Sequence, residues 1–424
     1  MRAIRPEDHC IFFETGRVDS HEFSSYYFVN PVGRLVLTHP SETDTFFSQL
    51  EHYTKKYYAA GFFSYELGYL LDDAFTAPHH SSFPYALFYL YDKPLVCDAR
   101  GTDTRITICG KDEKKHTYAI NDVRPSVSAE QYASDINTIK NHIKEGDIYQ
   151  ANYTFKYKFS FSGSSWALYQ ALKQKQNVSY HAYAQCGHYT LISLSPELFF
   201  SKQGSHIMVR PMKGTMKRGR TPIEDACQEH YLVNDEKNRS ENAMIVDLMR
   251  NDLGRISVPG SVKVTGMMNI EKFDTLFQMT SRIESTLRHN LSIRELVSSM
   301  FPSGSVTGAP KIRSMEIIRK LEHENRGIYT GAIGFFEPNG RAKFNVAIRT
   351  VLIQGTKGEM GVGGGIVYDS RVDSEYAEAQ LKARFFTEPG LSTFALIETI
   401  FYDQKYRNLH YHLDRMKASA EYFN

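Results

Sequence analysis

The chain has 424 residues, of which 42% are hydrophobic and 23% charged, and its formal net charge is +2. This composition is typical of a globular chain with a sizeable core, and the balanced charge argues against nucleic acid or an anionic membrane as the main partner. The five cysteines are scattered and no run of about 18 apolar residues occurs, so we expect no disulfide framework, zinc site, export signal or membrane span. We therefore expect a cytoplasmic protein.

The organisation of the chain predicts one large body and a short C-terminal segment. Residues 1–121 contain short, aromatic-rich runs and turns, and we expect them to complete the sheets of that body. A polar run at 111–116 marks the first boundary, and Pro and Gly at 389–390 mark the second. The expected parts are an N-terminal part at 1–121, a catalytic part at 122–387 and a C-terminal segment at 391–424.

The region after the first boundary begins with a predicted helix and strand. Residues 128–131 have the capping-box pattern and apolar residues follow at helical spacing, so a helix should run to about Gly146. Residues 149–161 alternate between apolar and polar side chains, which predicts a long, half-buried antiparallel strand. Its polar face begins at Gln150 and either lines a cavity or faces water.

The remaining elements complete the prediction of the fold class. Strands are expected at 190–194, 206–210 and 344–353, and helices at about 235–252, 310–323 and 373–386. Strands grouped with intervening helices, without regular alternation, predict an α+β fold with antiparallel sheets.

The helix expected at 235–252 carries an unusual carboxylate. Its spacing places Glu241 on the apolar stripe with Met244, Ile245 and Leu248. A buried carboxylate must be paired, protonated or bound to a metal. The alternative to a functional role is a structural ion pair with Lys237, one turn earlier.

The helix expected at 373–386 carries a second group of charges. Glu375, Glu378 and Lys382 are spaced by 3 and 4 residues and share one side of the helix. They form either a solvated salt-bridge ladder or a site. The glycine-rich run at 361–365 favours a site, because glycines let backbone N–H groups approach a ligand carboxylate. Carboxylates from two helices would suit Mg²⁺.

A third group lies between these helices and the predicted strand. Glu197 follows a Ser-Pro pair at the start of an apolar strand, and Lys213 lies in a Pro/Gly turn near Arg210 and Arg218. Burial and neighbouring positive charge lower the pKa of a lysine and make it nucleophilic. The alternative is a basic surface turn.

Together these segments resemble the chorismate-utilising family, which contains anthranilate synthase, isochorismate synthase and aminodeoxychorismate synthase component I. The similarity runs from about Ser128 to Phe386. The matching segments are Gly-Asp-Ile-Tyr-Gln at 146–150, Ser-Pro-Glu at 195–197, Pro-Met-Lys-Gly-Thr at 211–215, the helical segment at 238–248, Gly-Ala-Pro-Lys at 308–311, Tyr-Thr-Gly at 329–331, Ala-Ile-Arg-Thr at 347–350 and Gly-Gly-Gly-Ile-Val at 363–367. The resemblance implies two large, mostly antiparallel β-sheets packed face to face, with helices outside.

The resemblance also implies a set of binding residues for Mg²⁺ and chorismate. The carboxylates that would hold Mg²⁺ on the ring carboxylate of chorismate are Glu241, Glu378 and, nearby, Glu375. The groups that would contact chorismate itself are Lys382 and the backbone of Gly364 and Gly365 at the ring carboxylate, Tyr329 and Arg349 at the enolpyruvyl carboxylate, and Ser305 and Thr307 near the ring.

Two positions select among the chemistries of the family. Members that add water to chorismate have a Lys where this chain has Gln150, which cannot act as that base; Gln150 is expected to contact the substrate, and ammonia should be the nucleophile. Anthranilate synthases usually have Ala where this chain has Lys213. A lysine there resembles aminodeoxychorismate synthase, in which it would attack C2 while Glu197 acts as general acid. Gln278, where anthranilate synthase has a His, weighs further against pyruvate elimination.

The resemblance also implies partners and leaves rival functions open. Ammonia would come from a glutamine amidotransferase subunit, and the product would be 4-amino-4-deoxychorismate, for para-aminobenzoate and folate. The rivals are an anthranilate synthase component I, an isochorismate or salicylate synthase, and a catalytically silent chorismate-binding subunit.

The segment at 391–424 resembles the beginning of aminodeoxychorismate lyase, a pyridoxal-phosphate enzyme. It is too short for that fold, and the Schiff-base lysine of the lyase would lie beyond Asn424. We expect no bound pyridoxal phosphate. The alternative is a short tail that packs on the body.

Overall fold

The computed structural model describes residues 3–4, 9–18, 23–75, 81, 83–100, 107–108, 117–219, 221–273, 276–387 and 396–423. The boundaries expected at 111–116 and 389–390 lie outside these ranges, so the division into parts stays a prediction. None of the described helices is long and apolar enough to cross a membrane.

The first large sheet holds the long strand predicted from the alternating sequence. Every pairing within it is antiparallel. Its strands, in spatial order, are β18 (Gly308–Ala309), β10 (Gln150–Gly163), β22 (Lys357–Ile366), β21 (Thr350–Gln354), β12 (Tyr189–Ser195), β11 (Tyr180–Cys186), β2 (Ile11–Glu14), β3 (Ser24–Phe28) and β7 (Leu95–Asp98), with β9 (Tyr118–Pro125) also paired to β10.

The second large sheet is also antiparallel throughout. Its strands, in spatial order, are β15 (Met212–Lys217), β17 (Leu276–Thr286), β14 (His206–Arg210), β13 (Leu198–Gln203), β20 (Ala342–Val346), β19 (Ala332–Phe336), β5 (Tyr58–Phe63), β6 (Ala86–Tyr91) and β4 (Gly33–Leu37), with β16 (Lys263–Lys272) also paired to β17. Two small pairs complete the strands: β1 (Ala3–Ile4) with β8 (Thr107–Ile108), and β23 (Tyr402–Asp403) with β24 (Lys405–Tyr406).

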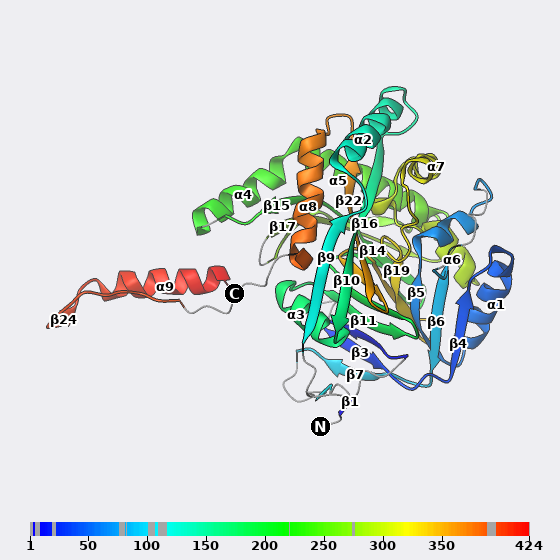
Figure 1. Cartoon of the computed structure of the whole chain (residues 1–424), viewed down its shortest axis with the longest axis horizontal. Coiled ribbons are helices and arrows are strands. Elements are labelled where there is room, and N and C mark those ends of the chain that lie inside the picture. The colour runs from blue at the N-terminus through cyan, green and yellow to red at the C-terminus, as the bar shows by residue number, and fades with distance from the viewer. Residues whose placement is uncertain are drawn as a thin grey trace.

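The two sheets pack face to face with helices on their outer sides (Figure 1). One apolar cluster joins the sheets and contains Phe28 from the first and Phe62 and Phe335 from the second. A second cluster packs helices on the first sheet and a third packs helices on the second. The helices are α1 (Thr43–Tyr53), α2 (Ala129–Lys144), α3 (Ser165–Lys175), α4 (Pro222–Asn234), α5 (Glu236–Gly254), α6 (Ile293–Met300), α7 (Lys311–Leu321), α8 (Val372–Thr387) and α9 (Leu409–Phe423), with short 3₁₀ turns η1 (Pro40–Glu42), η2 (Tyr65–Leu70) and η3 (Gly304–Val306). The predicted two-sheet α+β fold is confirmed.

The predicted start and end of the helix are confirmed at α2, although only the Ser128 half of the predicted capping box forms. The Ser128 hydroxyl accepts a hydrogen bond from the backbone N–H of Gln131 at 3.2 Å, as an N-cap should. The Gln131 side chain donates to Asp135 (2.9 Å). The helix ends at Lys144, just before Gly146, whose φ of 81° is accessible to glycine at little cost.

Two strand predictions need correction. β10 forms where expected, but its first half is buried on both faces: Gln150, Asn152 and Thr154 of the polar face are buried along with the apolar face. The strand expected at 344–353 is two strands, β20 and β21, which belong to different sheets. The chain crosses between the sheets at 347–349, where Arg349 has a φ of 50°.

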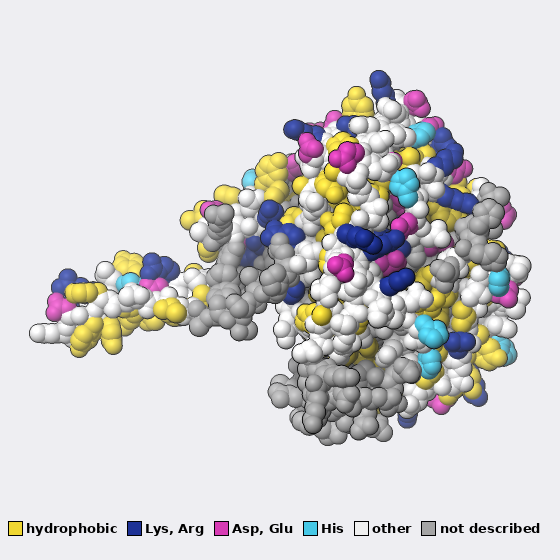
Figure 2. Space-filling model, in the orientation of Figure 1, with side chains coloured by type: hydrophobic (Ala, Val, Ile, Leu, Met, Phe, Trp, Pro, Cys, Tyr) yellow, Lys and Arg dark blue, Asp and Glu magenta, His cyan; other side chains and the backbone are white. Residues whose placement is uncertain are grey.

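The C-terminal segment lies apart from the two-sheet body. Figure 1 shows α9 projecting away from it, and Figure 2 shows hydrophobic side chains along that helix. Leu413, which the helical spacing places on the apolar face, is 44% exposed. The described part of the tail exposes these side chains, and the choice between a lyase-like segment and a packed tail stays open.

Candidate functional site

The predicted acid lies in the interior between the sheets. Glu197 connects β12 to β13 and is only 3% exposed, and the Ser305 hydroxyl donates a hydrogen bond to its Oε1 at 2.5 Å. Burial raises the pKa of Glu197 to about 7, although that hydrogen bond and the nearby charge of Lys213 lower it. A carboxyl with this pKa is protonated in a large fraction of molecules at neutral pH, which suits a general acid.

Lys213 enters the same interior from an irregular part of β15. The register of β15 against β17 shifts between Met212 and Thr215, which is the pattern of a β-bulge. Gly214 in the bulge has a φ of 91°. Burial lowers the pKa of Lys213 and Lys382 lowers it further, against the opposing charges of nearby carboxylates. Lys213 itself is half-buried, and its role in catalysis stays a prediction.

Gln278, which stands where anthranilate synthase has a His, holds the bulge by two hydrogen bonds. Gln278 on β17 donates from Nε2 to the Gly214 carbonyl (2.9 Å) and accepts from the Thr215 hydroxyl (3.0 Å). Gln278 is 8% exposed. Both hydrogen bonds go to the two residues that follow Lys213, so Gln278 fixes the backbone that carries the amine.

The predicted metal-binding carboxylates come together from α5 and α8. Lys237 Nζ lies 4.0 Å from Glu241 Oε1 and 3.9 Å from Glu375 Oε1, so one ammonium bridges the two helices. Glu378 pairs with Lys382 at 2.8 Å, one turn along α8. The ion pair between Glu241 and Lys237 weighed from the sequence is thus present, but it belongs to a larger group of charges.

The electrostatics of this group indicate a site that attracts a cation. Burial raises the pKa of Glu375, and the charge of Glu378 adds to the effect, while Lys382 lowers the pKa of Glu378. The Ser370 hydroxyl donates to Glu375 Oε1 at 2.6 Å and fixes its orientation. Carboxylate oxygens are ligands that Mg²⁺ accepts in proteins, and Glu241 and Glu375 lie on either side of one ammonium.

The glycine-rich strand β22 runs between the two groups. A Cβ on Gly364 would lie 3.6 Å from both Glu375 Oε2 and Lys382 Nζ, and a Cβ on Gly365 would overlap Gln150 Nε2 and lie 3.1 Å from Lys213 Nζ. The buried Gln150 Oε1 has no hydrogen-bond partner among the described residues. The absence of side chains on β22 is therefore what lets the lysine amine, the Gln150 amide and the carboxylates share one site.

Arg349 provides a cation at the crossing between the sheets. Burial lowers its pKa to about 10, and its Nη1 donates to Gln176 Oε1 at 2.6 Å. Within the described ranges no carboxylate forms a salt bridge with this guanidinium. Nearby on the glycine strand, a Cβ on Gly361 would overlap the ring of the buried Tyr329. A half-buried guanidinium without a counter-ion among these residues favours an anionic ligand.

The hydroxyls predicted near the ring lie in and after η3. The Ser305 hydroxyl donates its hydrogen bond to Glu197, and the Ser305 oxygen lies 2.9 Å from the Ser303 oxygen. The Thr307 hydroxyl donates to the Ser303 carbonyl (3.1 Å), which leaves its oxygen as an acceptor. Neither Ser303 nor Gln176 has a motif signal in the sequence, because only the folded chain brings them to the site.

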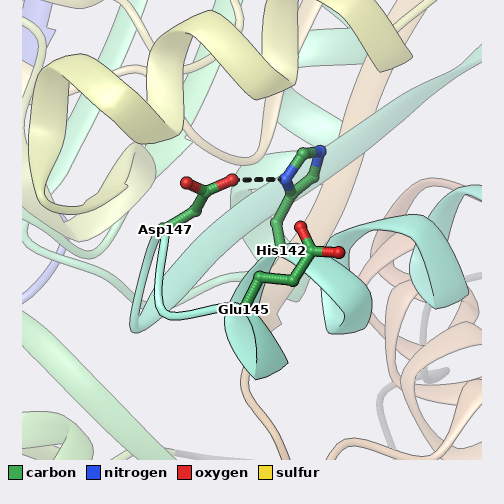
Figure 3. A group of neighbouring side chains, drawn as sticks. All are labelled: His142, Glu145 and Asp147. Atoms are coloured by element: carbon green, nitrogen blue, oxygen red, sulfur yellow. Dashed lines mark hydrogen bonds and ion pairs between the residues drawn. The ribbon is translucent and has the colours of Figure 1, made fainter.

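A separate group of potential metal ligands lies at the end of α2 (Figure 3). His142 Nδ1 and Asp147 Oδ2 are 2.7 Å apart, and Arg313 donates to the same oxygen at 2.9 Å. Glu145 completes the group and is exposed. The Asp147 oxygen is paired with Arg313. This group shares no residue with the carboxylates of α5 and α8.

Known proteins share much of their sequence with this chain. Aminodeoxychorismate synthase component 1 of Salmonella typhimurium is 34% identical over 349 residues, which cover 78% of this chain and 76% of that protein. The protein of the same name from Bacillus subtilis is 39% identical over 59% of this chain, and anthranilate synthase component 1 of Neisseria meningitidis is 37% identical over 64%. The chain spans about half the length of these last two relatives, 54% in each case.

Solved structures share the fold. Anthranilate synthase component I from Streptococcus pneumoniae superposes with a TM-score of 0.75 at 24% identity, covering 87% of this chain and 92% of that one. Menaquinone-specific isochorismate synthase from Escherichia coli gives 0.69 at 16% identity, covering 89% and 88%. The family model for chorismate binding enzymes matches residues 8–388. The chain therefore belongs to the chorismate binding enzyme family.

Proposed function

We propose that this protein is an aminodeoxychorismate synthase component I, which converts chorismate and ammonia to 4-amino-4-deoxychorismate. The observation that carries the proposal is the half-buried amine of Lys213, whose pKa is lowered by burial, in a site where the amide of Gln150 stands in place of a water-activating lysine. Relatives named aminodeoxychorismate synthase component 1 support it.

The proposed reaction has two displacement steps. The neutral Nζ of Lys213 attacks C2 of chorismate, the ring double bonds shift, and the C4–O bond breaks as Glu197 protonates the departing hydroxyl, so that water leaves. Ammonia then attacks C4, the double bonds shift back, and the C2–N bond breaks to release neutral Lys213. The ammonium formed at C4 returns a proton to Glu197, which restores the acid. Covalent catalysis divides one hard allylic displacement into two easier steps.

Substrate binding in this proposal uses the two charged ends of the site. Arg349 and Tyr329 would hold the enolpyruvyl carboxylate, while Lys382 and the backbone of Gly364 and Gly365 would contact the ring carboxylate. Ser305, Thr307 and Gln150 would surround the ring. A local cationic pocket of this kind binds a dianion without a large net charge on the protein.

The proposal includes a Mg²⁺ ion held by Glu241, Glu375 and Glu378. The chemistry of the donor set fits, because carboxylate oxygens suit Mg²⁺ and all three carboxylates now pair with lysine ammonium groups, Glu241 and Glu375 with the same one. When bound, Mg²⁺ would offset charge on the ring carboxylate of chorismate. A glutamine amidotransferase subunit as the ammonia source, a role in para-aminobenzoate and folate synthesis, and a cytoplasmic location belong to the same proposal.

An anthranilate synthase is the second candidate, because relatives of that name match this chain as well. Gln278 argues against an anthranilate synthase, because its amide is hydrogen-bonded to the Gly214 carbonyl and the Thr215 hydroxyl. Gln278 therefore supplies no group for pyruvate elimination.

The test is one incubation with chorismate, Mg²⁺ and ammonium chloride, followed by chromatography with fluorescence detection. The proposal predicts 4-amino-4-deoxychorismate that requires ammonia. Fluorescent anthranilate, or isochorismate or salicylate formed without ammonia, would each contradict it, as would chorismate binding without turnover.

A further inference from the structure

We propose that Lys237 is a built-in competitor for the cation site: its ammonium bridges Glu241 and Glu375 when no metal is bound and moves to solvent when Mg²⁺ enters. The inference rests on the metal site of the proposed function. It adds a residue that controls how tightly that site holds its ion.

The geometry places Lys237 at the solvent side of the carboxylates. Its side chain is 53% exposed, whereas Glu241 is 16% and Glu375 7% exposed. The two separations of 4.0 and 3.9 Å are at the outer limit of an ion pair, while Lys382 and Glu378 meet at 2.8 Å. One ammonium thus lies between two carboxylates without making a close contact to either.

The charges explain why this ammonium and a divalent ion exclude each other. Lys237 is among the charges that lower the pKa values of both Glu375 and Glu378, so it acts on the whole carboxylate group. A dication among the same oxygens would lie within several ångströms of the ammonium, where like charges repel by about 1 kcal/mol per unit-charge pair even in water. The flexible four-carbon stem allows the ammonium to move outward.

The consequence is an exchange of one cation for another. Without metal, Lys237 relieves the repulsion between the carboxylates of α5 and α8 and keeps the two helices in place. With metal, the ammonium loses its partners, which weakens metal binding and favours release. Lys237 therefore holds the carboxylates in position before the metal binds, and it lowers the affinity of these carboxylates for the metal.

The experiment measures metal affinity directly, in the full chain and without chorismate. Free Mn²⁺, which also prefers carboxylate oxygens, is counted by electron paramagnetic resonance during titration, and Mg²⁺ affinity follows from competition. Lys237→Met removes the charge and keeps the stem. Arg250→Met is the matched control, because Arg250 is 52% exposed on the same helix and pairs with Asp247. Lys237→Gln is measured as a second variant, with a thermal melt to verify folding.

Both Lys237 variants should bind Mn²⁺ and Mg²⁺ about tenfold more tightly than the wild type, and the difference should shrink as salt rises. Arg250→Met should stay within about twofold. Unchanged or weaker binding in folded Lys237 variants would overturn the inference and leave the metal site intact. Absence of binding in every protein would overturn the metal site and the inference together.

Discussion

The hydrogen bond from Ser305 to Glu197 makes a directional prediction about the acid. The Ser305 hydroxyl donates to the carboxylate and so favours its charged form. In Ser305→Ala this donor is lost while Glu197 stays buried, so the pKa of Glu197 should rise above its value of about 7.

The size of the rise follows from the energy of the bond. A hydrogen bond to a charged group contributes about 1.5–3 kcal/mol, and one pKa unit corresponds to about 1.36 kcal/mol. This range gives roughly one to two units, and partial replacement by the nearby Ser303 hydroxyl, 2.9 Å from that of Ser305, favours the lower end. Glu197 in the variant should therefore titrate near pH 8, about one unit higher.

Infrared titration of the protonated-carboxyl band measures the pKa of Glu197 directly. The part of the band that disappears in Glu197→Gln belongs to Glu197. Ser303→Ala is the control, because Ser303 contacts Ser305 but has no hydrogen bond to Glu197; its shift should stay under about half a unit. A Glu197 that titrates in Ser305→Ala at or below its wild-type pH would refute the reasoning.

Three further predictions follow from the same geometry. Burial raises the pKa of Glu197 from 4.5 to about 7, so its stabilising neutral form is lost as the pH rises through 7. Glu197→Gln should therefore be more stable than the wild type at pH 8, by about 2 kcal/mol in urea unfolding. Equal stability at that pH would contradict the burial argument. Gln278→Met removes both bonds to the bulge and should lower kcat about tenfold with little change in the KM for chorismate, whereas a rise in KM alone would argue against positioning of Lys213. Arg349→Met should weaken chorismate binding about 100-fold by calorimetry without loss of thermal stability, and unchanged affinity would remove Arg349 from the site.

Local sequence patterns predicted the elements well where packing agrees with periodicity. The capping pattern at Ser128 and the alternation from 149 to 161 both reflect rules that act within a few residues, and α2 and β10 form there. The burial of the polar face of β10 was not predictable in this way. It depends on residues distant in the chain, such as Glu322, which accepts hydrogen bonds from Thr154, and Arg326, which donates to the Asn152 carbonyl.

The site residues were likewise predictable where they share one helix and not where distant segments meet. The spacing of Glu375, Glu378 and Lys382 on one helix was readable from the sequence, and the structure keeps them together on α8. The crossing that places Arg349 is different: residues 344–353 look like one continuous strand because both β20 and β21 are apolar, and only their assignment to separate sheets reveals the break. The bulge at Lys213 likewise depends on Gln278, a residue more than sixty positions away.

The central claim is that Lys213 becomes covalently bonded to the substrate, and peptide mass spectrometry after acid quench tests it most directly. Protein incubated with chorismate and Mg²⁺, without ammonia, should gain the mass of one chorismate less one water on the peptide that contains Lys213. Added ammonium chloride should remove this mass as 4-amino-4-deoxychorismate appears, and Lys213→Ala should show neither event. Formation of that product by Lys213→Ala at the wild-type rate, with no adduct on the wild-type protein, would contradict the account.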